Sequence, residues 1–117
     1  MQDFEIKFYK KEDGSCPTIE YLNELENKLR SKVLRGMQLL ENNGNELREP
    51  YSKHLGDGIF ELRTKQGSDI ARVLYFFIIG RKIVITHGFT KNTQKPPRRE
   101  IEMARKYRKD YLKREGE

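Results

Sequence analysis

The 117-residue sequence has few of the residues on which metal-dependent and membrane functions depend. Its single cysteine, Cys16, cannot form an internal disulfide and offers no zinc-ligand spacing. Its two histidines, His54 and His87, stand far apart without ligand spacing. The longest apolar run, residues 73–79, is far shorter than the ~20 residues of a membrane-spanning helix. The N-terminal segment lacks the apolar core of a secretory signal. We therefore expect a cytoplasmic protein with no metal, no other cofactor and no membrane partner.

Motifs of covalent and nucleotide-dependent catalysis are also missing. We find no Gly-rich phosphate loop, no nucleophile elbow and no carboxylate pair in an apolar setting. Charged residues make up 36% of the chain, above the usual ~25%. The apolar residues nevertheless come in dense blocks, which favours a folded chain over a disordered one. The length predicts one domain over residues 1–117.

The net charge of +6 is unevenly distributed along the chain. From residue 81 to the end there are twelve Lys or Arg against five Asp or Glu. Such a clustered surplus indicates a polyanionic or acidic partner, either nucleic acid or an acidic protein. The alternative is a solvated basic helix that has no partner.

Hydrophobic periodicity predicts the elements in the order β-α-α-β-β-β-α. An alternating strand over residues 4–8 is followed by two helices that share residues 17–43, as a hairpin with its break near residues 27–30. Residues 45–58 are polar and broken by proline and glycine, so we expect a loop. Three β-rich runs (59–64, 70–79 and 83–89) then predict an antiparallel meander, and a basic helix is expected over 97–114. The fold class is α+β, with the helices on one face of the sheet and the other face or its rim free for a ligand.

Arginines within the meander are the main candidates for a binding site. Strict alternation places Arg63 and Arg72 on one face if their strands are adjacent, where they would form an anion cradle with Lys91. A buried arginine needs an acidic partner or an open cleft. The alternative for Arg72 is therefore a structural ion pair with Glu61 or Asp69.

Three stretches in combination resemble a known family: LGDGIFELR (55–63), ARVLYFF (71–77) and residues 82–112, which contain HGFTKNTQKPP. They are similar to the RelE/ParE toxin superfamily, and more closely to the phage-derived HigB-like branch of type II toxin–antitoxin systems. The resemblance spans nearly the whole chain and implies a RelE-like fold. It also implies a ribosome-dependent endonuclease that cleaves mRNA, inhibits translation and arrests growth. The implied partners are the ribosome, mRNA and an antitoxin that is usually a helix-turn-helix DNA-binding protein.

The resemblance also implies roles for individual residues. Arg72 matches the strand arginine that contacts the scissile phosphate, and Arg63 and Lys91 match recurrent basic positions. His54 lies in the loop where HigB-type toxins can carry a functional histidine. The sequence departs from the family at Phe60 and Glu61, where RelE-like toxins often have lysines.

Metal-free RNA cleavage requires a deprotonated 2′-hydroxyl, a stabilised phosphorane and a protonated leaving oxygen. The basic residues named above would stabilise the phosphorane, and His54 or His87 would transfer protons, with Glu61 as a further candidate. For each histidine the alternative is a structural or surface role. Single-stranded RNA is commonly held by stacking and by phosphate contacts. We expect these contacts from Tyr51, Lys53, Phe89, Lys95, Arg98 and Arg99.

Two further hypotheses stay open at this point. One is a toxin of the same fold that inhibits DNA gyrase, as ParE does. The other is a non-catalytic nucleic-acid-binding protein whose site is the basic C-terminal helix.

Overall fold

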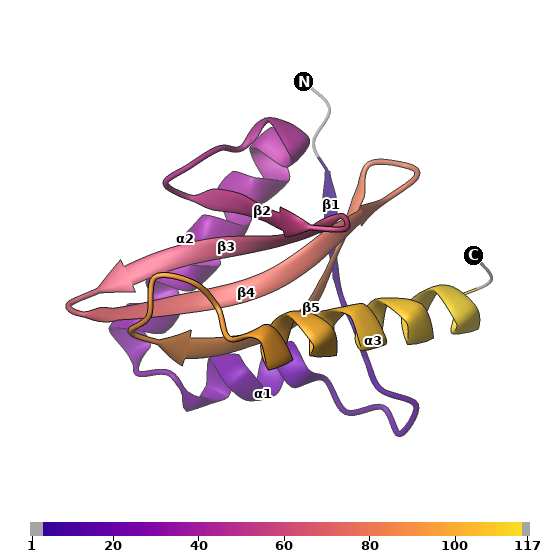
Figure 1. The fold of residues 1–117 in the computed structure, drawn as a ribbon, viewed down its shortest axis with the longest axis horizontal. Helices are drawn as coiled ribbons and strands as arrows, with labels where there is room; N and C mark the ends of the chain where they lie inside the picture. The colour runs from indigo at the N-terminus through magenta and orange to yellow at the C-terminus, as the bar shows by residue number, and fades with distance from the viewer. Residues whose placement is uncertain (1–3, 116–117) are drawn as a thin grey trace.

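The computed structural model describes residues 4–115, which form a five-stranded sheet with helices on both faces (Figure 1). The helices are α1 (Pro17–Glu24), α2 (Asn27–Asn43) and α3 (Arg98–Arg114), with a short 3₁₀ turn, η1 (Gly44–Glu46), after α2. Within the described residues, no helix is long and apolar enough to cross a membrane.

The break between α1 and α2 falls at Leu25 and Glu26, slightly earlier than predicted. The Arg30 guanidinium donates hydrogen bonds to the carbonyl oxygens of Leu22 (2.8 Å) and Leu25 (2.7 Å). Carbonyls at a helix C-terminus lack intrahelical partners, so this arginine caps α1 from the first turn of α2. At the other end of α2, Gly44 adopts a positive φ of 55°, as expected from the Asn-Asn-Gly sequence.

The strand order is β1-β5-β4-β3-β2, and three of the four pairings are antiparallel. The meander predicted from the sequence is confirmed, with β3 (Ile59–Gln66), β4 (Asp69–Ile78) and β5 (Lys82–Lys91) adjacent. The exception is β1 (Glu5–Phe8), which pairs in parallel with β5. The direction of β1 relative to β5 is decided by the path of the chain through α1 and α2. Local periodicity therefore carries no information about it.

A fifth strand, β2 (Ser52–Gly56), lies in the segment that we expected to be a loop. As an edge strand it tolerates polar residues, and Lys53 and His54 are exposed. The hairpin turn that joins it to β3 is formed by Asp57 and Gly58, both with positive φ (55° and 75°). An Asp-Gly pair between two strands is a strong hairpin signal, and it is the sequence feature from which β2 could have been predicted but was not.

Each face of the sheet packs against different helices. One face carries α1 and α2 over a core that includes Leu62, Val73 and Tyr75. The opposite face carries α3, whose Ala104 is buried in a second core. Figure 1 shows α3 in front of the sheet and α2 behind it. The expectation that the second face is free of helices is therefore wrong, because the apolar side of the C-terminal helix covers part of it.

Candidate nucleic-acid interface

The two strand arginines lie on the same face of the sheet, as the alternation predicted. Arg63 in β3 is the direct cross-strand partner of Arg72 in β4. Residues opposite each other in an antiparallel pair project to the same side. Glu61 shares that side with Arg63, since it lies two positions away along β3.

Arg72 is completely buried and forms an ion pair. Its Nε donates to Oε1 of Glu61 at 2.7 Å, and both side chains are at most 1% exposed. Its Nη2 donates to the carbonyl oxygens of Thr93 (2.8 Å) and Gln94 (2.7 Å). The solvent-facing cradle of three cations is therefore not formed, and the alternative, an ion pair with Glu61, is the arrangement observed. In this geometry Arg72 acts as a positioning residue that holds the loop after β5.

The same cluster contains buried polar atoms that have no hydrogen-bond partner among the described residues. They are Oε2 of Glu61, Nε of Arg63 and Nη1 of Arg72. The closest approach of Arg63 to the carboxylate is 3.8 Å, which is longer than a hydrogen bond. Buried polar groups are satisfied in the great majority of native structures, so this concentration at one point marks the cluster as a candidate ligand site.

A bulge in β5 decides which side chains join this face. Pairing shifts at Thr86, so that Phe76 faces Val84, whereas Leu74 faces His87. The Thr86 hydroxyl donates to the Leu74 carbonyl at 3.1 Å. The extra residue rotates the rest of the strand, which brings His87, Phe89 and Lys91 to the α3 face.

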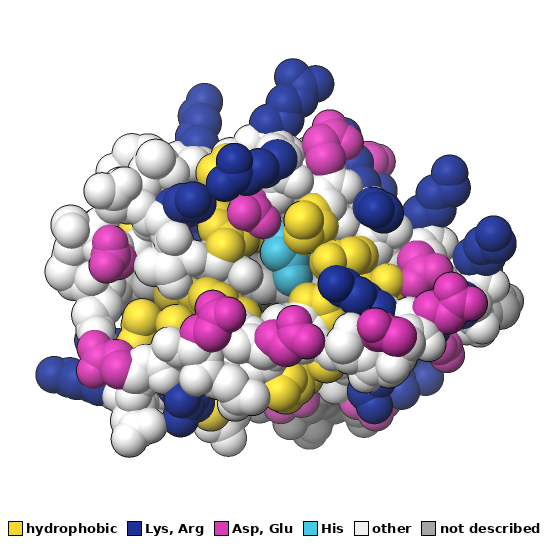
Figure 2. Space-filling model, turned by 90° about the horizontal axis from the view of Figure 1, so that it is seen from below, with side chains coloured by type: hydrophobic (Ala, Val, Ile, Leu, Met, Phe, Trp, Pro, Cys, Tyr) yellow, Lys and Arg dark blue, Asp and Glu magenta, His cyan; other side chains and the backbone are white. Residues whose placement is uncertain are grey.

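His87 is buried beneath the start of α3. Its Nε2 lies 2.9 Å from Oε1 of Glu100, and its Nδ1 lies 3.1 Å from the Thr86 hydroxyl. Burial lowers the pKa of His87 below its usual 6.5, although hydrogen bonding to Glu100 opposes the shift. The pocket it lines, of about 290 Å³, also contains Glu20 and Glu24 of α1. Figure 2 shows a histidine among hydrophobic side chains with acidic groups nearby. These acids make the pocket a poor place for an RNA phosphate.

His54 is on the opposite side of the sheet from Arg72. It is the cross-strand partner of Phe60, which packs in the core under α1 and α2. The His54 ring lies 4.6 Å from the Phe60 ring, and its Nε2 accepts a hydrogen bond from the Gly58 N–H at 3.1 Å. The structure therefore does not bring His54 together with the other predicted catalytic residues.

Four of the predicted RNA contacts are basic residues with exposed side chains. Lys53 is the cross-strand partner of Glu61, so its exposed side chain belongs to the α3 face. Lys95 is exposed in the loop that Arg72 holds. Arg98 and Arg99 are exposed in the first turn of α3, within 4.0 Å of acidic residues of the same helix.

The two aromatic candidates differ in exposure. Phe89 is only 8% exposed and lies opposite Arg72 on β5, so its ring is not presented for stacking. Tyr51 is 51% exposed and lines a groove with Arg63. The groove also contains three cations that the sequence reasoning missed: Lys32, Arg35 and Lys65. The positions of Lys32 and Arg35 on one side of α2 gave no signal, since any exposed helix face carries such residues.

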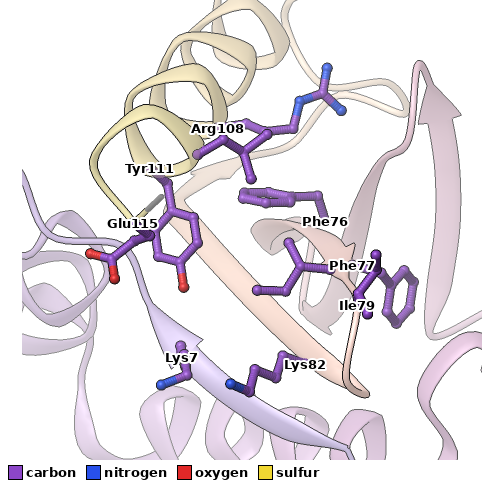
Figure 3. Close-up of a pocket in the computed structure, with 10 residues that line it drawn as sticks. Lys7, Phe76, Phe77, Ile79, Lys82, Arg108, Tyr111 and Glu115 are labelled. Atoms are coloured by element: carbon purple, nitrogen blue, oxygen red, sulfur yellow. The ribbon is translucent and has the colours of Figure 1, made fainter. Parts of the chain in front are cut away.

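A pocket of about 660 Å³ lies near the other end of α3 and is shown in Figure 3. Phe76 and Tyr111 line it, and Lys7 and Lys82 lie along one side. None of the predicted site residues lines it. Along β4, Arg72 and Ile78 are about 20 Å apart at the usual rise per residue. This pocket is therefore separate from the charged cluster.

The fold is thus α+β, and the charged cluster lies on the α3 side of its sheet. A family model described as "Phage derived protein Gp49-like (DUF891)" matches residues 20–109. The chain thus belongs to the Gp49-like family, which is a family of RelE-like toxins of toxin–antitoxin systems. The matched range contains the charged cluster and all of the predicted site residues. No curated protein matches the chain.

Proposed function

We propose that this protein is a ribosome-dependent mRNA endonuclease of the HigB-like type, paired with an antitoxin that is a helix-turn-helix DNA-binding protein. The observation that carries the proposal is the Glu61–Arg72–Arg63 cluster, with its unsatisfied buried polar atoms, inside a chain of a RelE-like toxin family. Buried charges contribute little net stability, so a cluster of this kind is better explained by ligand binding than by folding.

The basic residues of this region would have different roles in binding an RNA phosphate. Arg63 is 17% exposed in its side chain, and Lys91 is half-buried on the same face. These two cations would contact the phosphate and stabilise the charge that develops on it. Arg72 would hold the loop that carries Lys95, so that Lys95 can contact the RNA backbone next to that phosphate. Orientation of the message by the ribosome would supply a further large part of the rate acceleration.

Neither histidine is well placed to transfer a proton during RNA cleavage. His87 is held by Glu100 in a buried, acid-rimmed pocket, and His54 lies on the far face. We infer that the chemistry depends mainly on charge stabilisation and positioning. Attack of the 2′-oxygen on the phosphorus would release the 5′-oxygen of the next nucleotide, with the proton lost from the 2′-hydroxyl and one gained by the leaving oxygen.

The test is cleavage of a defined mRNA by the purified chain on translating ribosomes, with the ends mapped. The variants Arg63→Ala and Lys91→Ala are each expected to reduce the cleavage rate by about 10²–10³, the usual loss for one preorganised charge-stabilising group. Lys113→Ala, at the exposed end of α3, is the matched control and is expected to cleave normally. Normal cleavage by both cluster variants would refute the site.

Arg72→Ala is a poor test by comparison. Its removal leaves the Glu61 carboxylate buried without its partner, so lost activity would also follow from misfolding. Arg72→Lys with a check of the folded state by circular dichroism separates the two, because lysine keeps the charge and loses the fork that binds Thr93 and Gln94.

A second function is favoured by one observation, the burial of Arg72 and His87. A toxin that inhibits DNA gyrase, or one that binds nucleic acid without cleaving it, needs no exposed catalytic group. Growth arrest with intact cellular mRNA after induction of the wild-type chain would support this alternative and contradict the endonuclease.

A further inference from the structure

An open groove of about 490 Å³ lies between α2 and the edge of the sheet at the end of β3. Its charged lining residues are all basic: Lys32, Arg35, Arg63 and Lys65. β2 pairs with β3 only as far as Leu62, so the last residues of β3 form an uncovered edge at this point. The groove is thus bounded by one helix face and one strand edge, and no described residue that lines it is acidic.

The cations of this groove differ from those of the C-terminal helix. All five arginines of α3 lie within 4.0 Å of a carboxylate, as Arg108 does with Asp57 at 2.8 Å. In the part of the chain that the structure describes, Lys32, Arg35 and Lys65 form no ion pair. Their charge is therefore available to an external polyanion, although the first two-thirds of the sequence carries no basic surplus.

An exposed aromatic ring lies in the same groove. Tyr51 is 51% exposed, and its backbone on either side is held by hydrogen bonds to Arg48 and Arg63. A fixed backbone with an exposed ring is suited to stacking on an unpaired base. Cations alone would suit any acidic partner, whereas a ring among cations suits single-stranded nucleic acid in particular.

Arg63 connects the groove to the charged cluster. It lines the groove and also approaches Glu61, the partner of Arg72, to 3.8 Å. An RNA strand that lies in the groove would therefore reach Arg63, the residue that the groove shares with the cluster.

We propose that this groove binds single-stranded RNA on one side of the cleavage site, with Tyr51 stacking on a base and Lys32, Arg35 and Lys65 contacting the backbone phosphates. The proposal rests on the proposed function for its choice of RNA as ligand. It concerns binding only and requires no further chemistry.

The first experiment measures binding of a fluorescein-labelled oligouridylate of about ten nucleotides by fluorescence anisotropy, in the absence of ribosomes. The full chain is compared with the variant Lys32→Gln/Arg35→Gln/Lys65→Gln over a range of salt concentrations. Each phosphate contact on a single strand contributes about 0.7 to the slope of log affinity against log salt. Loss of three contacts is therefore expected to reduce that slope by about 2.

The matched control is Lys106→Gln/Lys109→Gln/Lys113→Gln, which removes the same charge from the exposed side of α3. Its slope of log affinity against log salt should stay close to that of the wild type, apart from a small change due to the lower net charge. Equal losses in the two triple variants would overturn the proposal, because binding would then depend on overall charge.

The second experiment tests the ring. Tyr51→Ala is expected to weaken RNA binding about 5- to 150-fold, the usual loss of one base–aromatic stack, and Tyr51→Phe to retain it. An unchanged affinity in Tyr51→Ala, together with displacement of the RNA by poly-glutamate at equal charge, would assign the groove to an acidic protein and overturn the RNA proposal.

The RNA-binding and cleavage experiments can separate failure of the groove proposal from failure of the endonuclease proposal. Groove-dependent RNA binding without cleavage on ribosomes supports the groove and contradicts the endonuclease. Cleavage together with wild-type RNA binding by the groove variant supports the endonuclease and contradicts the groove.

Discussion

The two faces of the sheet bury different kinds of side chain. Under α1 and α2 the core is aliphatic and aromatic, and Phe60, Tyr75 and Phe77 form ring contacts with centroids 5.3–5.7 Å apart. Its buried polar contact between strands is the hydrogen bond of 2.5 Å between the Ser52 and Tyr75 hydroxyls. This face has the composition that stability alone favours.

The face under α3 buries charge. Glu61 and Arg72 are 0% exposed, and His87 is 5% exposed. A hydrophobic pair of the same volume would be as stable as a buried ion pair or more so. We infer from this difference that the buried charges are kept for ligand binding rather than for stability, since they lie at the proposed site.

The largest effect is expected from breaking the buried ion pair on the charged face. Glu61→Ala leaves the Arg72 guanidinium buried without its carboxylate, so the free energy of unfolding should fall by about 3–5 kcal/mol. The double variant Glu61→Leu/Arg72→Leu should regain most of the lost unfolding free energy. It should nevertheless not be toxic, because the charged cluster is gone. Urea denaturation and a growth assay measure the two properties. A toxic, stable double variant would show that the pair is structural only.

The packing of the other face is tested at Gly88. A Cβ added there would lie 2.3 Å from Cδ2 of Tyr21, whose ring covers the strand, so Gly88→Ala should cost about 1–3 kcal/mol by overpacking. Gly36→Ala in α2 is the control. Its Cβ would meet Leu62 at an ordinary 3.5 Å, and removal of a helical glycine should stabilise by up to about 1 kcal/mol. Equal destabilisation by the two would mean that the steric argument is wrong.

A smaller loss is expected at the polar contact of that face. Tyr75→Phe removes one hydroxyl and leaves that of Ser52 buried, at a cost of about 1 kcal/mol. The double variant Tyr75→Phe/Ser52→Ala should not cost more than the single one, since the hydroxyls act as a pair. Additive losses in denaturation experiments would contradict the pairing.

The smallest effect concerns pH. Burial lowers the pKa of His87 in the native state, so below about pH 6.5 the unfolded chain binds more protons at this residue than the native chain. Stability should therefore fall as the pH drops from 7 to 5.5, and less steeply in His87→Gln. Parallel pH profiles of the two proteins, measured by thermal unfolding, would show that the histidine is not held neutral.

Local sequence signals were sufficient for most of the fold. The apolar spacing in α1 and α2, the Gly44 cap and the alternation of Arg63 and Arg72 were all confirmed. β2 was missed because its residues are polar, and the Asp57–Gly58 turn that predicts it was not used. The parallel pairing of β1 has no local signal at all, since it depends on contacts between distant parts of the chain.

The candidate site was foreseen only in part. Alternation placed Arg63 and Arg72 together, but it could not decide between a phosphate and Glu61 as the partner of Arg72. The side to which His87 points depends on the Thr86 bulge, which shifts the alternation by one residue. The groove combines residues from α2, β3 and the segment before β2. No window of sequence contains all of these.

The order of residues thus specified the elements, the face that each strand residue joins before a bulge, and the family. These properties follow from interactions over a few residues, where the periods of helix and strand apply. Tertiary packing decided which charges are neutralised. Arginines of the basic C-terminal helix pair with acids of their own helix and with Asp57, whereas Lys32, Arg35 and Lys65 form no ion pair with any residue that the structure describes. Charge pairing depends on distances of a few ångströms in space, and the sequence alone does not contain them.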